Sequence, residues 1–268
     1  MQTSNRLRRS DALGGFDILD SVVGRFAYAP HRHPELVIAT YISGAKQARC
    51  GGMSLGIAAG DILLIGPEEL HDGRTLDTSG WAYRAAYLSP WQVADCTGLS
   101  TFSVEDRIAG HRLIRGRPSL ARRVSTALEE RAASDLALPE VLLHLLSDMG
   151  TTRIDTIPPS PAIRRVRDRL EDDPATPVTL PDLAALAGLS PEHLSRQFKA
   201  AYGLSPFQYV TQARLRLARN ALAEGVSIGE AACLAGFADQ SHLTRWFKRC
   251  FGVAPGAFVR SQFRSRRP

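Results

Sequence analysis

Apolar residues in the first third of the chain come in short stretches that alternate with turn-forming residues. The clearest stretches are Leu36–Tyr41, Ile62–Ile65 and Tyr83–Leu88, and segments rich in Gly, Ser and Ala lie between them. Short strands at regular spacing with intervening turns are typical of a β-sandwich or a β-barrel. We therefore expect residues 16–90 to form the strands of such a structure.

Helical periodicity replaces this pattern over residues 119–132 and 139–149. The second segment carries an apolar stripe on one helix face, formed by Val141, Leu142, Leu145 and Leu146. Such a stripe packs either on the sheet of its own domain or on a second copy of the chain. Both alternatives are open at this point, and the second one predicts a homodimer.

Prolines and polar residues then interrupt the chain. Residues 151–161 are predicted to be a linker between an N-terminal domain over 16–150 and a C-terminal domain over 162–268. Residues 1–15 contain basic residues without an apolar segment behind them. We interpret them as a flexible tail and not as a secretion signal.

The C-terminal part contains an internal repeat, residues 180–210 and 227–259. Seven residues recur at an offset of 49, and they are His193, Leu194, Arg196, Phe198, Lys199, Gly203 and Pro206, which match His242, Leu243, Arg245, Phe247, Lys248, Gly252 and Pro255. Each copy has an Ala-rich helix, a glycine, a capping residue and a second helix with one apolar face. This is the plan of a helix-turn-helix unit, and a helix over about 206–223 is expected to join the two units.

The basic surplus lies entirely in this part of the chain. Residues 161–268 hold 16 Arg and Lys against 9 Asp and Glu, a net charge of +7, whereas residues 1–160 hold 17 against 18, a net charge of −1. Such asymmetry favours a polyanionic partner for the C-terminal domain. No apolar run approaches membrane-spanning length and no cysteines are spaced as CxxC, so we expect a cytoplasmic protein without a membrane partner.

The repeated unit resembles the DNA-binding domain of the AraC family of transcription regulators, above all in the segment IGEAACLAGFADQSHLTRWFKRCFGVAPGAF. The segments PHRHPE (30–35) and GDILLIGPEELHDGR (60–74) resemble the cupin-type effector-binding domain that many of these regulators carry. The resemblance implies an α+β chain, with a cupin-type β-barrel (a jelly roll) and flanking helices first. An all-α domain with two helix-turn-helix units follows it.

The function implied by the resemblance is sequence-specific regulation of transcription, controlled by a small-molecule effector in the N-terminal barrel. The expected partners are double-stranded operator DNA, the effector, RNA polymerase and a second copy of the chain, and neither enzymatic activity nor a cofactor is expected. Two alternatives stay open: a metal-dependent cupin enzyme fused to a DNA-binding domain, and a DNA-architectural protein without a ligand. The size of the N-terminal domain speaks against the latter.

By the resemblance, the first turns of each second helix contact DNA bases. The residues carried over are Glu192, Ser195 and Arg196 in the first unit, and Gln240, Ser241, His242 and Arg245 in the second. Arg can bind guanine and Gln can bind adenine through two hydrogen bonds. Lys199 and Lys248 lie further along their helices and are expected to contact the phosphate backbone.

Three histidines are the candidate effector-binding residues. His31 and His33 are two apart and share one face of a strand, and His71 belongs to the second cupin-like segment. We expect them to line or brace the effector pocket. A divalent metal site and satisfied core histidines are the alternatives, and Glu35 follows His33 too closely to match the usual cupin glutamate ligand. Tyr83 and Arg84 lie on an expected barrel strand, and we expect either that one of them pairs with an anionic ligand or that they lie on a solvated outer face.

Overall fold

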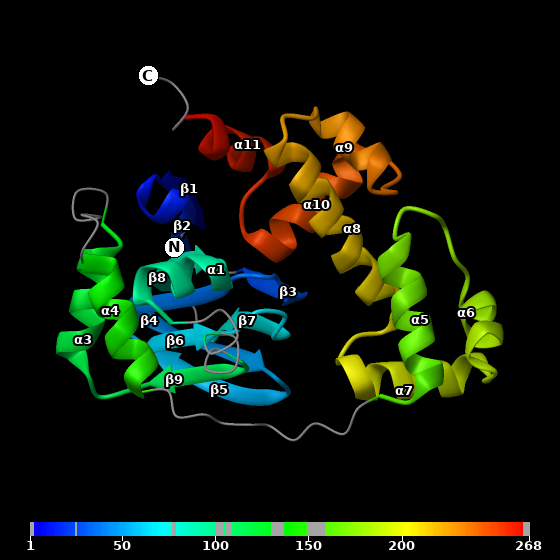
Figure 1. The fold of residues 1–268 in the computed structure, drawn as a ribbon, viewed down its shortest axis with the longest axis horizontal. Coiled ribbons are helices and arrows are strands. Elements are labelled where there is room, and N and C mark those ends of the chain that lie inside the picture. The colour runs from blue at the N-terminus through cyan, green and yellow to red at the C-terminus, as the bar shows by residue number, and fades with distance from the viewer. Residues whose placement is uncertain are drawn as a thin grey trace. The chain divides into compact units, whose positions relative to one another are not determined.

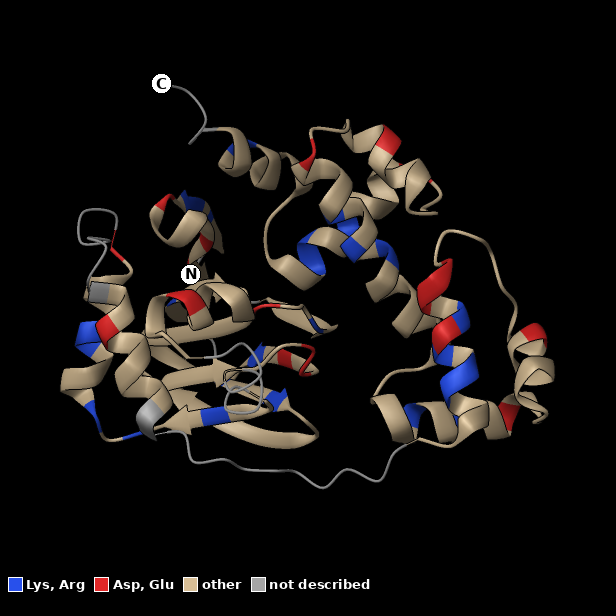
Figure 2. Cartoon of the chain, in the orientation of Figure 1, with Lys and Arg blue, Asp and Glu red and all other residues tan. Residues whose placement is uncertain are grey.

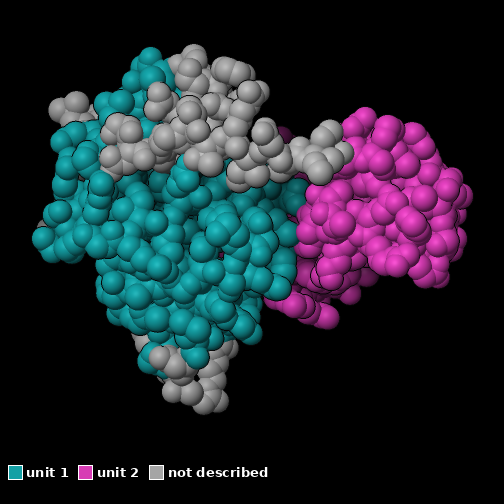
Figure 3. Space-filling view, turned by 90° about the horizontal axis from the view of Figure 1, so that it is seen from below, with its two compact units in different colours: residues 1–153, 260–268 teal, residues 154–259 magenta. Residues whose placement is uncertain are grey.

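The structure, a computed structural model, describes residues 3–24, 26–76, 79–99, 104, 109–129, 137–148 and 159–264. The chain divides into two compact units, residues 1–153 with 260–268 and residues 154–259 (Figure 3). Strands come first and helices dominate later, so the α+β class is confirmed (Figure 1). Residues 151–158 of the expected linker lie outside the described residues, and the domain boundaries stay predictions.

The larger part of the N-terminal sheet has the strand order β1-β2-β8-β4-β6-β9, with every neighbouring pair antiparallel. The strands are β1 (Ser4–Ser10), β2 (Phe16–Val23), β8 (Trp81–Leu88), β4 (Leu36–Cys50), β6 (Ile62–Ile65) and β9 (His111–Ile114). The interpretation of residues 1–15 as a flexible tail is wrong, because Ser4–Ser10 pair along their whole length with β2 and a short 3-10 helix, η1 (Ala12–Gly14), follows.

Strand β4 belongs to two sheets. Its residues 36–44 pair with β8, with an irregularity between Tyr41 and Ser43, and residues 37–40 also pair with β6. Residues 45–50 pair with β5 (Met53–Ala58), and part of this stretch pairs with β7 (His71–Thr75). Strand β3 (Ala27–His31) pairs with β7. Among the described strands, β1 and β9 each pair with one neighbour only, so the sheet is not closed as the expected barrel would be.

Helices cover the outer face of the larger sheet. They are α1 (Pro90–Thr97), α3 (Pro118–Ala127) and α4 (Ala137–Asp148), and their apolar residues share one core with those of β2, β4, β6 and β8. Val141, Leu142, Leu145 and Leu146 are at most 3% exposed and lie in this core. The stripe therefore packs on its own domain, and the interpretation of it as a dimer surface is wrong.

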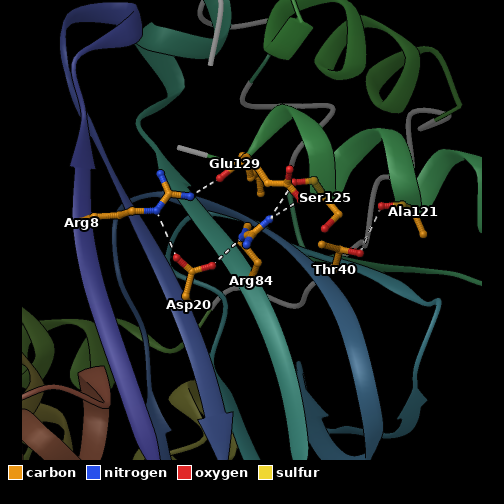
Figure 4. A network of polar contacts seen from close by, with 8 residues as sticks. Arg8, Asp20, Thr40, Arg84, Ala121, Ser125 and Glu129 are labelled. Carbon is orange, nitrogen blue, oxygen red and sulfur yellow. Dashed lines mark hydrogen bonds and ion pairs between the residues drawn. The ribbon is translucent and has the colours of Figure 1, made fainter. Parts of the chain in front are cut away.

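A polar network ties β1, β2 and β8 to the end of α3 (Figure 4). The Asp20 carboxylate accepts hydrogen bonds from Arg8, at 3.1 Å, and from Arg84, at 2.5 Å. Arg84 also donates to the carbonyl of Ser125, at 2.9 Å, and Arg8 donates to the carbonyl of Leu128. Hydrogen bonds and charge from the two arginines lower the pKa of Asp20 against the opposing effect of burial. Arg84 thus has a structural partner, which neither expectation for it foresaw.

The C-terminal part consists of seven described helices: α5 (Pro161–Asp172), α6 (Leu180–Ala187), α7 (Pro191–Tyr202), α8 (Pro206–Ala223), α9 (Ile228–Leu234), α10 (Gln240–Phe251) and α11 (Pro255–Arg264). Side chains cap most of their N-termini. Capping boxes open α6, α8 and α9, and the side chains of Ser190 and Asp239 accept from the backbone of α7 and α10. The two expected helix-turn-helix units and the helix that joins them are therefore present.

Candidate DNA-binding helices and effector site

The two helix-turn-helix units are α6 with α7 and α9 with α10, and we call α7 and α10 the recognition helices. Leu194 and Phe198 are fully buried on α7, as are Leu243 and Phe247 on α10. Because these pairs are four residues apart, each helix turns one apolar stripe inward and its polar residues outward. Figure 2 shows basic residues on the helices of this unit, α5, α8 and α10 among them.

Most of the residues expected to contact DNA lie on the outward face of the recognition helices. The exposed residues among them are Glu192, Arg196, Lys199, Gln240, Ser241, Arg245 and Lys248. Ser195 is half-buried. Among the described residues, no carboxylate lies within ion-pair distance of Arg245 or Lys248. Both cations are thus available to a polyanion.

His242 differs from the other expected DNA contacts. Its Nε2 atom accepts a hydrogen bond from the indole of Trp246, at 3.1 Å, and its ring packs edge-on against Phe237 at a centroid distance of 5.4 Å. These contacts hold the ring against the turn of the second unit. We infer that His242 positions the helix start, and its role as a base contact stays a prediction.

Sequence reasoning missed Thr244. It occupies the position of Ser195 at the repeat offset of 49, and it is half-buried on the same helix face. The repeat offset was sufficient to find Thr244, because it matches Ser195, which had been carried over as a DNA contact. Thr244 therefore joins the set of candidate DNA contacts.

Three arginines of the joining helix α8 contact other residues of the helical unit. Arg214 donates to the carbonyl of Pro174, at 2.6 Å, and Arg216 lies 3.8 Å from the Glu171 carboxylate. The guanidinium of Arg219 lies 5.9 Å from the centroid of the Phe251 ring. Each of these arginines thus has a neighbour within the helical unit.

The three candidate histidines of the N-terminal domain come together. His31 ends β3 and pairs directly with His71 at the start of β7, and His33 follows two residues after His31. A register shift between Tyr28 and His31 inserts one extra residue in β3. It places the His31 side chain on the same inward face as that of His71. The ring centroids of His31 and His71 are 4.2 Å apart, and those of His33 and His71 are 4.9 Å apart.

Burial keeps two of these imidazoles neutral. It lowers the pKa of His31 to about 3 and that of His71 well below its usual value, and the neighbouring histidines and Lys46 act in the same direction. All three histidines are at most 9% exposed. Glu35 lies with its carboxylate 3.8 Å from Nδ1 of His33 and is not part of the histidine cluster.

Lys46 is the residue of this region that sequence reasoning missed. It lies on β4, is 7% exposed, and its ammonium group is 5.1 Å from the ring centroid of Tyr41, 5.6 Å from that of Tyr83 and 5.9 Å from that of Trp81. Among the described residues it forms no ion pair, and burial lowers its pKa to about 8. Its inward position follows from the pairing of β4 with β7, which the sequence alone does not show.

Gly73 makes room for this ammonium group. A Cβ atom at Gly73 would lie 3.2 Å from Nζ of Lys46, and Gly73 is two residues from His71 on the same face of β7. Lys46 and the histidine cluster thus belong to one inward-facing surface of β3, β4 and β7. That surface combines a cation, three imidazoles and several aromatic rings.

Comparisons with known proteins agree with both halves of the chain. Residues 183–261 match a family described as a helix-turn-helix domain, and residues 19–146 match the AraC-like ligand binding domain. An uncharacterized HTH-type transcriptional regulator, YbfI of Bacillus subtilis, is 34% identical over 231 residues, which cover 80% of each chain. RipA, an HTH-type transcriptional regulator of Corynebacterium glutamicum, is 36% identical over 46% of this chain and 38% of its own length.

The fold of the whole chain is similar to that of ToxT from Vibrio cholerae O395. The TM-score is 0.55 at 14% sequence identity, and the match covers 97% of this chain and 98% of ToxT. A second structure, of ToxT from strain SCE256 bound to an unsaturated fatty acid, has a TM-score of 0.53 at 13% identity and covers 96% of this chain and 94% of ToxT. Of the helices in the described part of the chain, none is long and apolar enough to cross a membrane.

Proposed function

Because the chain belongs to the AraC family of helix-turn-helix transcription regulators, we propose that α7 and α10 read operator DNA in successive stretches of the major groove. The exposed cations on the outward faces of the two helices carry this proposal. Arg196 and Arg245 contact bases, and Lys199 and Lys248 contact phosphates. A second copy of the chain and RNA polymerase are the proposed protein partners, in the cytoplasm.

DNA selected by the full-length protein from a random pool tests this assignment. Mobility-shift assays at several salt concentrations should show that affinity falls steeply with salt, because bound Arg and Lys displace counterions. They should also show tighter binding to the selected sequence than to random DNA. Equal, salt-insensitive binding to both would overturn the proposal.

We propose further that the effector binds on the inward surface formed by His31, His33, His71 and Lys46, and that it carries an anionic group. A buried ammonium without a carboxylate partner is costly unless a ligand supplies the opposite charge. The rings of Tyr41, Tyr83 and Trp81 around it suit an apolar or aromatic body. The fatty acid bound to a ToxT structure of similar fold is a ligand of this chemical type.

Thermal-shift measurements with carboxylates and their matching carboxamides, such as decanoate with decanamide and benzoate with benzamide, test the charge. The carboxylates should raise the melting temperature and the amides should not. Lys46→Met should abolish the difference, whereas Arg49→Met, on the outward face of the same strand, should preserve it. Equal shifts for acids and amides would contradict an anionic effector.

We infer that the chain acts as a regulator and not as an enzyme, since its relatives are named as transcription regulators. A dimer would use a surface other than the buried stripe of α4. Light scattering on the full-length chain tests the dimer; a monomer at high concentration, with and without operator DNA, would exclude it.

A further inference from the structure

The histidine cluster has the arrangement of a metal site as well as of a pocket wall. The candidate ligand atoms of His31, His33 and His71 all lie within 4.8 Å of one another. Two of the three come from hydrogen-bonded strands at directly paired positions, and the third follows on the same segment. Small side-chain movements would bring three nitrogens to the distance of about 2.0–2.1 Å from one ion that imidazole ligation requires.

One nitrogen of each ring, Nδ1, contacts a backbone carbonyl. Nδ1 of His31 lies 2.8 Å from the carbonyl of Ala29, and Nδ1 of His71 lies 2.9 Å from the carbonyl of Glu69. Nδ1 of His33 lies 3.1 Å from the carbonyl of Glu35. A carbonyl oxygen can only accept, so each Nδ1 must carry the proton and donate it. In the neutral form of each ring, the lone pair therefore resides on Nε2.

This pattern is what ligating histidines show in proteins, where the second nitrogen donates to a carbonyl and thereby fixes tautomer and ring orientation. Core histidines need only one such contact each, in any direction. Here Nδ1 of all three rings, from β3, β7 and the segment after β3, faces a backbone carbonyl, and the candidate ligand atoms of the three side chains lie within 4.8 Å of one another. Three convergent acceptor nitrogens repel one another, and a cation between them relieves this repulsion.

We propose that His31, His33 and His71 bind one divalent transition-metal ion, zinc or a metal of similar preference. Neutral imidazoles favour such ions over calcium or magnesium, which prefer oxygen ligands. Three protein ligands leave a coordination position open toward the interior. The nearby Lys46 ammonium and the ion would both be neutralised by an anionic oxygen ligand there, so the ion and the lysine select the same class of effector. The selection of an anionic effector rests on the proposed function, whereas the binding of the metal ion does not.

Cobalt(II) is the probe that tests the site, because its visible absorption reports its ligands. Full-length protein treated with a chelator is titrated with Co²⁺, and the bound metal is then displaced with Zn²⁺. We expect one Co²⁺ per chain, absorption bands of a low-coordinate site, and imidazole scattering from three rings in X-ray absorption of the wild type. The absence of stoichiometric binding, or a spectrum with fewer than three imidazoles, would overturn the proposal.

Variants locate the ion. His71→Ala and His33→Gln should each weaken Co²⁺ binding at least tenfold, whereas His144→Ala, which removes an exposed histidine from α4 of the same domain, should leave it unchanged. Circular dichroism shows whether each variant is folded. If a variant does not fold, the number of imidazole ligands found by X-ray absorption in the wild type decides whether the three histidines bind the ion. Unchanged binding in both cluster variants would place the ion elsewhere.

Operator binding of the same samples separates this proposal from the proposed function. Stoichiometric Co²⁺ with no salt-sensitive DNA binding would support the metal site and refute the regulator. Salt-sensitive DNA binding without any Co²⁺ uptake would support the regulator and refute the metal site. The two failures are therefore distinguishable in one set of preparations.

Discussion

The recognition helices α7 and α10 are both 12 residues long, and both end at a glycine in the left-handed conformation, Gly203 and Gly252. Their turns also match, because the amide of Leu189 bonds to Ala184 and that of Phe237 bonds to Ala232. The chemistry on this shared backbone differs. α7 has one acidic and two basic residues, a net charge of +1, whereas α10 has three basic residues and none that is acidic, a net charge of +3.

The surroundings of the two turns differ as well. A Cβ atom at Gly236 in the second turn would lie 2.5 Å from the carbonyl oxygen of Ala175, whereas one at Gly188 in the first turn would have no neighbour within 4 Å. Arg214 fastens the same loop through the carbonyl of Pro174. The turn of the second unit thus contacts the loop after α5, whereas the turn of the first unit has open space at the corresponding glycine. The two units share a backbone and differ in packing and charge, and we therefore propose that they have unequal roles on DNA.

The largest expected effect concerns these two glycines. Gly236→Ala should destabilise the fold by about 2–5 kcal/mol, because a left-handed backbone costs a non-glycine residue about 1–2 kcal/mol and overpacking against Ala175 adds about 1–3 kcal/mol. Gly188→Ala carries only the backbone cost, about 1–2 kcal/mol. Urea unfolding of the full-length variants measures both, and equal losses would show that the loop yields to the new methyl group.

Substitutions of Arg245 and Arg196 test whether the two recognition helices contribute unequally to DNA binding. Arg245→Ala should weaken binding to the selected operator by about 1–3 kcal/mol, roughly 5- to 150-fold, and relax discrimination at one base position. Arg196→Ala should cost less, because Glu192 interacts with Arg196 and repels phosphates on the same helix face. Mobility shifts on operator and random DNA measure both. Equal losses of Arg245→Ala on both DNAs would make it a phosphate contact.

His242 and His193 occupy equivalent positions with different neighbours. His242→Ala should lower stability by about 1 kcal/mol, because it removes the hydrogen bond from Trp246 and the ring contact with Phe237. His193→Ala should be nearly neutral, since Gln197 and Leu189 stand in place of the two aromatic rings. Denaturant unfolding distinguishes them. A loss of DNA specificity in His242→Ala without a loss of stability would restore His242 as a base contact.

The sequence was sufficient for features that local chemistry determines. The repeat offset, the capping residues and the Leu–Phe pairs predicted both helix-turn-helix units, and the joining helix was placed at 206–223, where α8 lies. The convergence of three histidines followed from a likeness to known domains, and the irregular pairing of β3 that turns His31 inward has no sequence signal strong enough to predict it.

Features that depend on distant partners were missed. Periodicity shows that α4 has an apolar face but does not show what covers it, so its stripe was assigned to two alternatives. The polar residues of β1 gave no strand pattern, because its stability comes from pairing with β2 and from Arg8. Lys46 was overlooked because alternation on a long strand gives no register until its neighbours are known.

The smallest expected effect is the contribution of single lysines to the salt dependence of DNA binding. Lys248→Ala should lower the slope of log affinity against log salt by about 0.9, since each phosphate contact on duplex DNA releases about that many counterions. Over a fourfold change in salt this amounts to a factor of about 3.5 in relative affinity. Lys199→Ala should change the slope less, because the net charge of α7 is lower and Glu192 weakens the approach of a phosphate. Mobility shifts of each variant at four or more salt concentrations, on operator and on random DNA, measure the slopes. Identical slopes for the two variants would mean that both units approach the backbone equally closely, and the proposed inequality of the two units would then rest on Arg245 alone.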